Sequence, residues 1–223
     1  MDTEIKLKPV SKSKTLKESA YDEIKKIIIA GKINPDKYYS ANQFATMLGI
    51  SRTPVREAVM QLASEGFLVL HNGIGFKIKV SSSKEIKDFF ETRKILEIYL
   101  IQNFAEKMEK KDLDYLEIEL DIMKKYSITD DAEGFIESDK NFHAYFMKKS
   151  SNDYLINIME GLQELITIMG IKTIQQLKRK ESVIEEHQNI VDALKKNDVN
   201  AAIKAMSDHL DQTEELLLSN ESL

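Results

Sequence analysis

The spacing of apolar residues changes along the chain and predicts where its elements lie. From residue 16 to residue 64, apolar side chains recur every three to four positions, which is typical of amphipathic helices. The pattern predicts a helix from Leu16 that ends at Gly31, a short helix from about residue 41 to Gly49, and a third helix after Ser51. Two β-rich runs follow, "FLVL" and "FKIKV", and the segment "HNGIG" between them predicts a hairpin.

The third of these helices has an apolar side and a polar side. Because successive helical residues are about 100° apart around the axis, one arc consists of Val55, Val59 and Leu62, and the adjoining arc consists of Arg52, Thr53 and Arg56. Ser51 has the side chain of an N-cap, and Pro54 is tolerated within the first turn. A short helix, a turn and a helix with polar N-terminal residues form a helix-turn-helix, in which arginine contacts phosphates or guanine edges. Together with the hairpin this predicts a winged helix, whose tip at residues 71–75 reaches the minor groove.

From residue 84 onward the helical spacing continues without a convincing strand. Pro54 is the last proline, so none interrupts a helix in this part of the chain. The pattern predicts helices over residues 84–107, 111–126, 131–149, 153–174, 181–195 and 199–219. The expected fold is therefore mainly α, with an N-terminal winged helix-turn-helix domain and a C-terminal all-α helical bundle.

The expected domain boundaries follow from these elements. We predict a disordered N-terminal arm over residues 1–15, a winged helix DNA-binding domain over residues 16–80, a linker over residues 81–83, and a helical domain over residues 84–223. Ser83 is the expected cap of the first helix of the last domain.

Charge is distributed unevenly along the 223 residues, which carry a net charge of −5. Residues 1–80 contain 13 basic and 8 acidic side chains, whereas the rest contains 19 basic and 29 acidic ones. This indicates that only the basic N-terminal part, residues 1–80, binds a polyanion. We call this part the head and the remaining residues the body. The absence of cysteine excludes disulfides and thiolate chemistry. No apolar run is long enough to span a membrane and the N-terminus lacks a signal-peptide core, so we expect a cytoplasmic protein without a membrane partner.

Three histidines and one aspartate lie on apolar faces of the predicted body helices. Asp139 and His143 are four positions apart and therefore share a face. His187 precedes the turn at Asn197 by ten residues and His209 follows it by twelve, so an antiparallel pair brings both rings to a similar height. A lone histidine on an apolar face is usually a hydrogen-bonded core residue, but four such residues can converge on the bundle axis. Three imidazoles and one carboxylate suit a divalent metal ion, with Zn²⁺ as first choice and Ni, Mn or Fe(II) as alternatives.

Arg93 and Glu97 form a second polar pair on an apolar helix face, again four positions apart. One interpretation is an intrahelical ion pair. The other is an effector-binding site, in which Arg93 binds a small carboxylate with both arms of its guanidinium and Glu97 orients it.

The head resembles the winged helix of GntR-type bacterial transcription regulators over residues 16–80. The most specific segment is "ISRTPVREAV", with "I.AG.I.P" upstream and "L..EGF......G.GF" downstream. The resemblance implies that Arg52, Thr53 and Arg56 contact operator DNA, with Ser51 beside them. It also implies that the wing around His71 and Gly73 assists.

The body resembles the FCD ligand-sensing domain of one GntR subfamily. The matching segments are "ETRKILE", "SDKNFHAYFMKKSSNDYL", "EEHQNIVDALKKND" and "MSDHL", in this order. The resemblance implies a set of metal ligands, namely Asp139, His143, His187 and His209, and it makes Arg93 a candidate effector contact. It further implies a homodimer that binds a palindromic operator.

The leading hypothesis is a metabolite-responsive transcription regulator, expected to be a repressor and not an enzyme, which binds double-stranded DNA, a metal ion and a small carboxylate. One alternative is a regulator whose metal is structural or absent and whose effector binds elsewhere in the bundle. The other is a metal-dependent hydrolase with a DNA-binding head, for which Glu97 is the candidate general base.

Overall fold

The structure is a computed structural model, and it describes residues 14–29, 32–129, 131–174, 176 and 178–220. The chain forms two compact units, Met1–Lys79 and Val80–Leu223. Most of the expected disordered arm, residues 1–13, and the expected helix stop at Gly31 lie outside the described residues. Each unit is a separate body and is described by itself.

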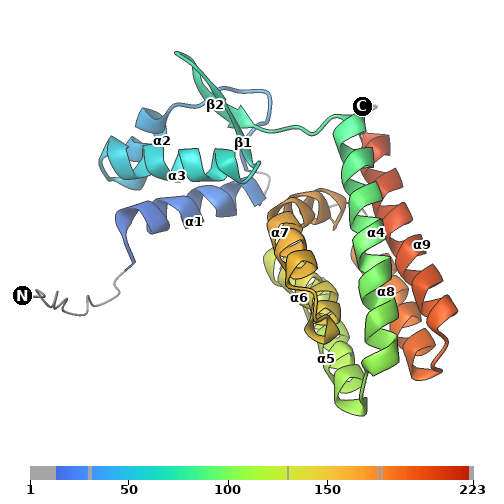
Figure 1. Cartoon of the computed structure of the whole chain (residues 1–223). Coiled ribbons are helices and arrows are strands. Elements are labelled where there is room, and N and C mark those ends of the chain that lie inside the picture. Colours follow the sequence, from blue (N-terminus) through green and yellow to red (C-terminus); the bar gives the residue numbers. More distant parts are fainter. Residues whose placement is uncertain (1–13, 30–31, 130, 175, 177, 221–223) are drawn as a thin grey trace, which may run out of the picture. The chain divides into compact units, whose positions relative to one another are not determined.

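The first unit has three helices followed by a hairpin in its described part (Figure 1). The elements are α1 (Leu16–Ile29), α2 (Ala41–Leu48), α3 (Arg52–Ser64), β1 (Leu68–His71) and β2 (Gly75–Ile78). Both α1 and α2 pack against α3. Their apolar faces enclose a core of Ala20, Ile24, Phe44, Val55, Val59 and Leu62. This is the predicted helix-turn-helix with its wing.

The turn and the wing depend on glycine at specific positions. Gly49 ends α2 in the left-handed region at φ 65°, where a side chain would be strained. Gly75 has φ 133°, and a Cβ there would lie 2.2 Å from the carbonyl oxygen of Tyr39. Tyr39 forms an isolated antiparallel bridge to Phe76, so a third extended segment is held against β2 at this point.

The second unit is all-helical in its described part (Figure 1). Its helices are α4 (Ser83–Lys107), α5 (Lys110–Ile128), α6 (Ala132–Tyr145), α7 (Asp153–Ile174), α8 (Arg179–Lys195) and α9 (Val199–Asn220), with a 3₁₀ turn over Phe146–Lys149 after α6. The expected cap of α4 is wrong by one residue. Ser82, not Ser83, accepts from the Glu85 backbone N–H, and the Glu85 side chain accepts from the Ser82 N–H in return.

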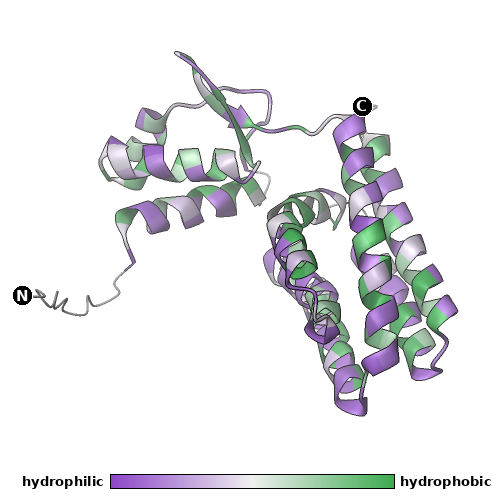
Figure 2. Cartoon of the chain, viewed as in Figure 1, coloured by the Kyte–Doolittle hydropathy of each residue, from purple (hydrophilic) through white to green (hydrophobic). Residues whose placement is uncertain are grey.

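The helices of the bundle bury one face each. α8 and α9 form an antiparallel hairpin, α4 lies along α9, and α5 packs against both α6 and α8. Figure 2 shows hydrophilic and hydrophobic residues alternating around α4 and α9, as in amphipathic helices. Fully buried side chains such as Phe90, Phe104, Phe142 and Ile190 fill the centre. The mainly α fold with a winged head and an all-helical body is thus confirmed, and no described helix is long and apolar enough to cross a membrane.

Candidate DNA interface and metal centre

The exposed face of α3 carries the predicted DNA contacts. Val55 and Ala58 are fully buried against the core, whereas the neighbouring Arg52, Thr53 and Arg56 are exposed. Proline at the third position of α3 removes no helical hydrogen bond, because the first N–H groups of a helix lack an acceptor within it. The first turn of α3 therefore presents two guanidinium groups to the solvent.

The wing lies beside this face. A hollow of about 540 Å³ is lined by Arg52 and Arg56 of α3 and by residues 70–76 of the hairpin. Gly73, at the tip, is exposed. His71 is only partly exposed, because its ring packs edge-on against Tyr38 at a centroid distance of 4.9 Å. The structure thus brings the predicted residues of helix and wing to one surface, with His71 held more tightly than its neighbours.

Ser51 occupies the N-cap position of α3 with extended backbone angles. Its side chain makes no capping hydrogen bond, unlike that of Ser40 at the start of α2. The expected position is confirmed, but the expected capping bond is not formed.

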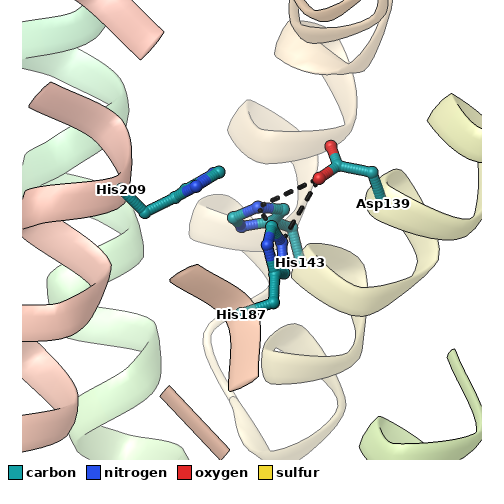
Figure 3. Close-up of side chains that lie close together, drawn as sticks. All are labelled: Asp139, His143, His187 and His209. Atoms are coloured by element: carbon teal, nitrogen blue, oxygen red, sulfur yellow. Dashed lines mark hydrogen bonds and ion pairs between the residues drawn. The ribbon is translucent and has the colours of Figure 1, made fainter. Parts of the chain in front are cut away.

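The four polar residues predicted to face the body core meet at one point. Asp139 and His143 lie on α6, His187 on α8 and His209 on α9 (Figure 3). One donor atom from each lies within 4.8 Å of the others, and the three imidazoles are buried. The Nε2 atoms of His143 and His187 are 3.2 Å apart, and Oδ1 of Asp139 lies 3.2 Å from Nε2 of His187.

The outer nitrogen of each imidazole faces an oxygen. Nδ1 of His187 donates to the Val183 carbonyl at 2.7 Å, one turn back on α8. Nδ1 of His143 donates to Oε2 of Glu97, and Nδ1 of His209 donates to Oε2 of Glu186 at 2.7 Å. A neutral imidazole with its hydrogen on Nδ1 has a lone pair on Nε2. The cluster therefore presents three inward nitrogen lone pairs and one carboxylate.

Burial favours the metal-binding protonation state of the cluster. Burial and the neighbouring His187 and His143 hold the pKa of His209 well below its usual value, so this ring is neutral at pH 7. Burial alone would raise the pKa of Asp139, but the neighbouring side chains of His187, His143 and His209 lower it overall, so the carboxylate is ionised.

This donor set matches a divalent metal ion. The inward atoms of all four side chains are hydrogen-bond acceptors, and none of them carries a hydrogen to donate to another. A cation is therefore the partner that satisfies all four groups at once. Nitrogen and oxygen donors without sulfur suit Zn²⁺ and also Ni, Mn or Fe(II). The outer oxygens at Nδ1 are the partners that metal-bound histidines ordinarily have.

Arg93 and Glu97 are both buried on α4 and form the intrahelical ion pair that was one of the two interpretations. Nε of Arg93 donates to Oε1 of Glu97, whose other oxygen accepts from His143. Burial opposes the ionisation of Glu97, but Arg93 and His143 lower its pKa to about 2. Nη2 of Arg93 is buried and has no hydrogen-bond partner among the described residues. This pair thus adjoins the cluster through His143 and leaves one guanidinium donor unused.

Two further buried residues, Arg179 and Glu186, lie next to the cluster and were not predicted from the sequence. Arg179 donates to both oxygens of Glu186, and Glu186 accepts from His209. For Glu186, the sequence signal was its position directly before His187, a predicted ligand. Arg179 gave none, because it precedes the segment in which helical spacing is evident.

These features together define a DNA-binding regulator with a separate helical domain that can hold a metal ion. The family models agree with this class. Residues 16–78 match the model for bacterial regulatory proteins of the gntR family, and residues 88–212 match the FCD domain. The chain belongs to the GntR family of transcription regulators, in the group with an FCD domain.

Relatives over most of the chain are also regulators. The HTH-type transcriptional regulator YdhC of Bacillus subtilis (strain 168) is 29% identical over 184 residues, which are 82% of this chain and 82% of that protein. The gluconate operon transcriptional repressor of Bacillus licheniformis is 25% identical over 210 residues, which are 90% of this chain and 86% of that protein. Both names describe transcriptional regulators.

A solved structure shares the fold of the body. The Zn²⁺-bound FCD domain of TM0439 is 22% identical, covers 64% of this chain and 97% of that chain, and superposes with a TM-score of 0.53. At 22% identity, the comparison shows a shared fold and nothing further.

Proposed function

We propose that this protein is a metabolite-responsive transcriptional repressor, whose helical domain holds a divalent metal ion and senses a small carboxylate. The observation that carries the proposal is the convergence of Asp139, His143, His187 and His209 in a domain joined to a winged helix. The names of two relatives add support, because one is a transcriptional repressor and the other is a Zn²⁺-bound FCD domain.

The head would bind the operator through the first turn of α3. Arg52 and Arg56 are exposed and can bind phosphates or the O6 and N7 atoms of guanine, and Thr53 lies between them. Gly73 at the wing tip and His71 at the end of β1 beside it would contact the neighbouring groove, and Ser51 would contact the backbone phosphates. A homodimer would place two such heads on the half-sites of a palindromic operator.

The metal centre would be held by the three inward imidazole nitrogens and the Asp139 carboxylate. We assign Zn²⁺ as the ion, because histidine and carboxylate donors in this number suit it. When bound, the ion would supply positive charge, and it could admit an oxygen ligand by expanding its coordination beyond the four protein donors. His187 would keep its orientation through the Val183 carbonyl whether or not the ion is present.

The effector would be a small organic acid. Arg93 is buried beside the cluster, and its Nη2 has no acceptor among the described residues, so it can donate to a carboxylate. Glu97 is engaged by Arg93 and His143 and would orient the guanidinium. These two engagements also make Glu97 a poor general base, so the geometry lends no support to a hydrolase.

The alternative of a structural metal rests on the burial of the cluster. The side chains of His143, His187 and His209 are exposed by only 1%, 0% and 4%, and that of Asp139 by 13%. An effector could reach such a site only if the neighbouring helices move. If the ion is structural, effectors would bind without contact to it.

One set of measurements separates these possibilities. Purified, metal-loaded protein is screened against small organic acids by thermal shift, and the screen is repeated with Arg93→Met. We expect a stabilising acid for the unchanged protein and a smaller shift for the variant, with operator affinity in the absence of acid retained. A full shift in Arg93→Met would remove Arg93 from the effector site, and a full shift in metal-free protein would favour the structural metal.

A further inference from the structure

The outer nitrogen of His209 is held by a chain of buried side chains. Nδ1 of His209 donates to Oε2 of Glu186 at 2.7 Å. Both oxygens of Glu186 accept from the guanidinium of Arg179, the first residue of α8. The exposed fractions of Arg179 and Glu186 are 3% and 8%, so both residues are buried.

We propose that Glu186 and Arg179 are positioning residues of the metal centre. An imidazole has one hydrogen when neutral, and whichever nitrogen lacks it can bind a metal. Because Glu186 accepts from Nδ1, the hydrogen of His209 stays on that atom and Nε2 keeps its lone pair directed into the cluster. The inference rests on the proposed metal function and assigns roles to two residues that do not touch the ion.

Arg179 fixes the orientation of the Glu186 carboxylate. A planar guanidinium that binds both carboxylate oxygens prevents the carboxylate from rotating. With both oxygens held in this way, Oε2 of Glu186 is an acceptor that faces Nδ1 of His209. Nη2 of Arg179 donates in addition to Oγ1 of Thr213 at 2.8 Å, and that hydroxyl donates to the backbone oxygen of His209 at 3.0 Å. Arg179 is thus linked to α9 directly through Thr213 and indirectly through Glu186 and the His209 ring.

The same arrangement occurs a second time in the cluster. His143 donates to Glu97, and Glu97 accepts from the buried Arg93. His187 instead uses a carbonyl of its own helix. Two of the three imidazoles therefore depend on an arginine-held carboxylate from another helix. Of these two, only the pair on α8 is separate from the proposed effector site, so it can be altered without touching Arg93.

The first test measures Zn²⁺ affinity by competition with a chelator on the full chain. Glu186→Gln is compared with Glu185→Gln, which makes the same charge change at the adjacent, exposed position. We expect about 10–100-fold weaker binding for Glu186→Gln, the loss typical of removing an outer partner of a ligand, and no change for Glu185→Gln. Arg179→Met should weaken binding in the same direction, and Thr213→Val should do so to a smaller degree.

The results distinguish this inference from the proposed function. If the unchanged protein does not take up Zn²⁺, the metal function itself fails and this inference fails with it. If the unchanged protein binds Zn²⁺ and folded Glu186→Gln binds it equally tightly, only the positioning role is overturned.

A second measurement can already overturn the proposal on the unchanged protein, and a merely structural role of Glu186 would not change its result. ¹⁵N NMR of the histidine rings in unchanged, metal-free protein reports which nitrogen of His209 carries the hydrogen. We expect it on Nδ1 alone, and in Glu186→Gln a mixture of both tautomers, because an amide can also donate. A hydrogen on Nε2 in the unchanged protein would overturn the proposal even if no variant folds.

Discussion

The Nε2 atoms of His143 and His187 lie 3.2 Å apart, although the residues are 44 positions apart in the chain. Their Nδ1 atoms donate to Glu97 and Val183 respectively, so both facing nitrogens have lone pairs. Two lone pairs at this distance repel unless a cation or an extra hydrogen lies between them. Asp139 and His209 complete the group.

The first prediction concerns metal content. Metal-loaded protein should hold about one ion per chain, and His187→Ala should lose it, because one of four donors is removed from a closed set. At a metal concentration of 100 times the dissociation constant, binding adds about 2.7 kcal/mol to the free energy of unfolding. Elemental analysis and thermal unfolding with and without chelator measure both effects. His71→Ala is the matched control, since His71 lies in the head; a metal-free unmutated protein would contradict the prediction.

The second prediction concerns DNA binding. Arg56→Ala should weaken operator binding by about 1–3 kcal/mol, or roughly 5–150-fold, because a bidentate arginine contact to a base edge is lost. Fluorescence anisotropy on an operator recovered from genomic fragments measures the affinity. Lys124→Ala removes the same charge from an exposed position of the body and should leave affinity unchanged. Equal affinities for the two variants would exclude the assigned role of Arg56.

The third prediction concerns the wing. Gly75→Ala places a Cβ 2.2 Å from the Tyr39 carbonyl oxygen, whereas a Cβ at Gly73 meets no atom of the described residues within 4 Å. The forced shift at Gly75 should cost about 1–3 kcal/mol of unfolding free energy and should also displace the wing and lower operator affinity. Gly73→Ala should cost only the strain of its positive φ, about 1–2 kcal/mol. Denaturant unfolding of both variants tests the order, and a smaller loss for Gly75→Ala would refute the close approach.

The fourth prediction concerns pH and a buried carboxylate outside the metal centre. Asp112 is 2% exposed; burial raises its pKa, but hydrogen bonds from Lys149, the Glu109 backbone and Tyr145 outweigh this and lower the pKa overall. A lowered folded-state pKa stabilises the fold above the unfolded value of about 3.9, and the contribution is lost as the pH falls through the folded value.

Asp112→Asn should therefore cost about 3–5 kcal/mol at pH 7, where a buried ion pair is broken, and less below about pH 4. Urea unfolding at pH 7 and pH 3 measures the difference. Asp121→Asn breaks an exposed pair with Lys124 and should cost less than about 1 kcal/mol. An equal loss of unfolding free energy for Asp112→Asn at both pH values would show that the ionisation of Asp112 contributes nothing to stability.

The local pattern of apolar and polar residues predicted the helices and the hairpin, because the formation of such elements depends on residues that are neighbours in sequence. The period of apolar residues located the helices of head and body, and the glycine-containing turns located the hairpin. Helix ends were less certain. The cap of α4 is Ser82 rather than Ser83, and α8 begins at Arg179 rather than at residue 181, because the first turn of a helix needs no apolar face.

The inward direction of His143, His187 and His209 was also predictable, since each lies among apolar residues of its own helix, and the turn at Asn197 set the relative height of the last two. The partners of their outer nitrogens were not. Whether Nδ1 of His209 faces Glu186 or water depends on the angle and distance between α8 and α9, which no single helix contains. The sequence by itself therefore determined which donors face the core. For His143 and His209, only tertiary packing decided which nitrogen points inward, because the oxygen that faces Nδ1 comes from another helix, whereas His187 uses a carbonyl one turn back on its own helix.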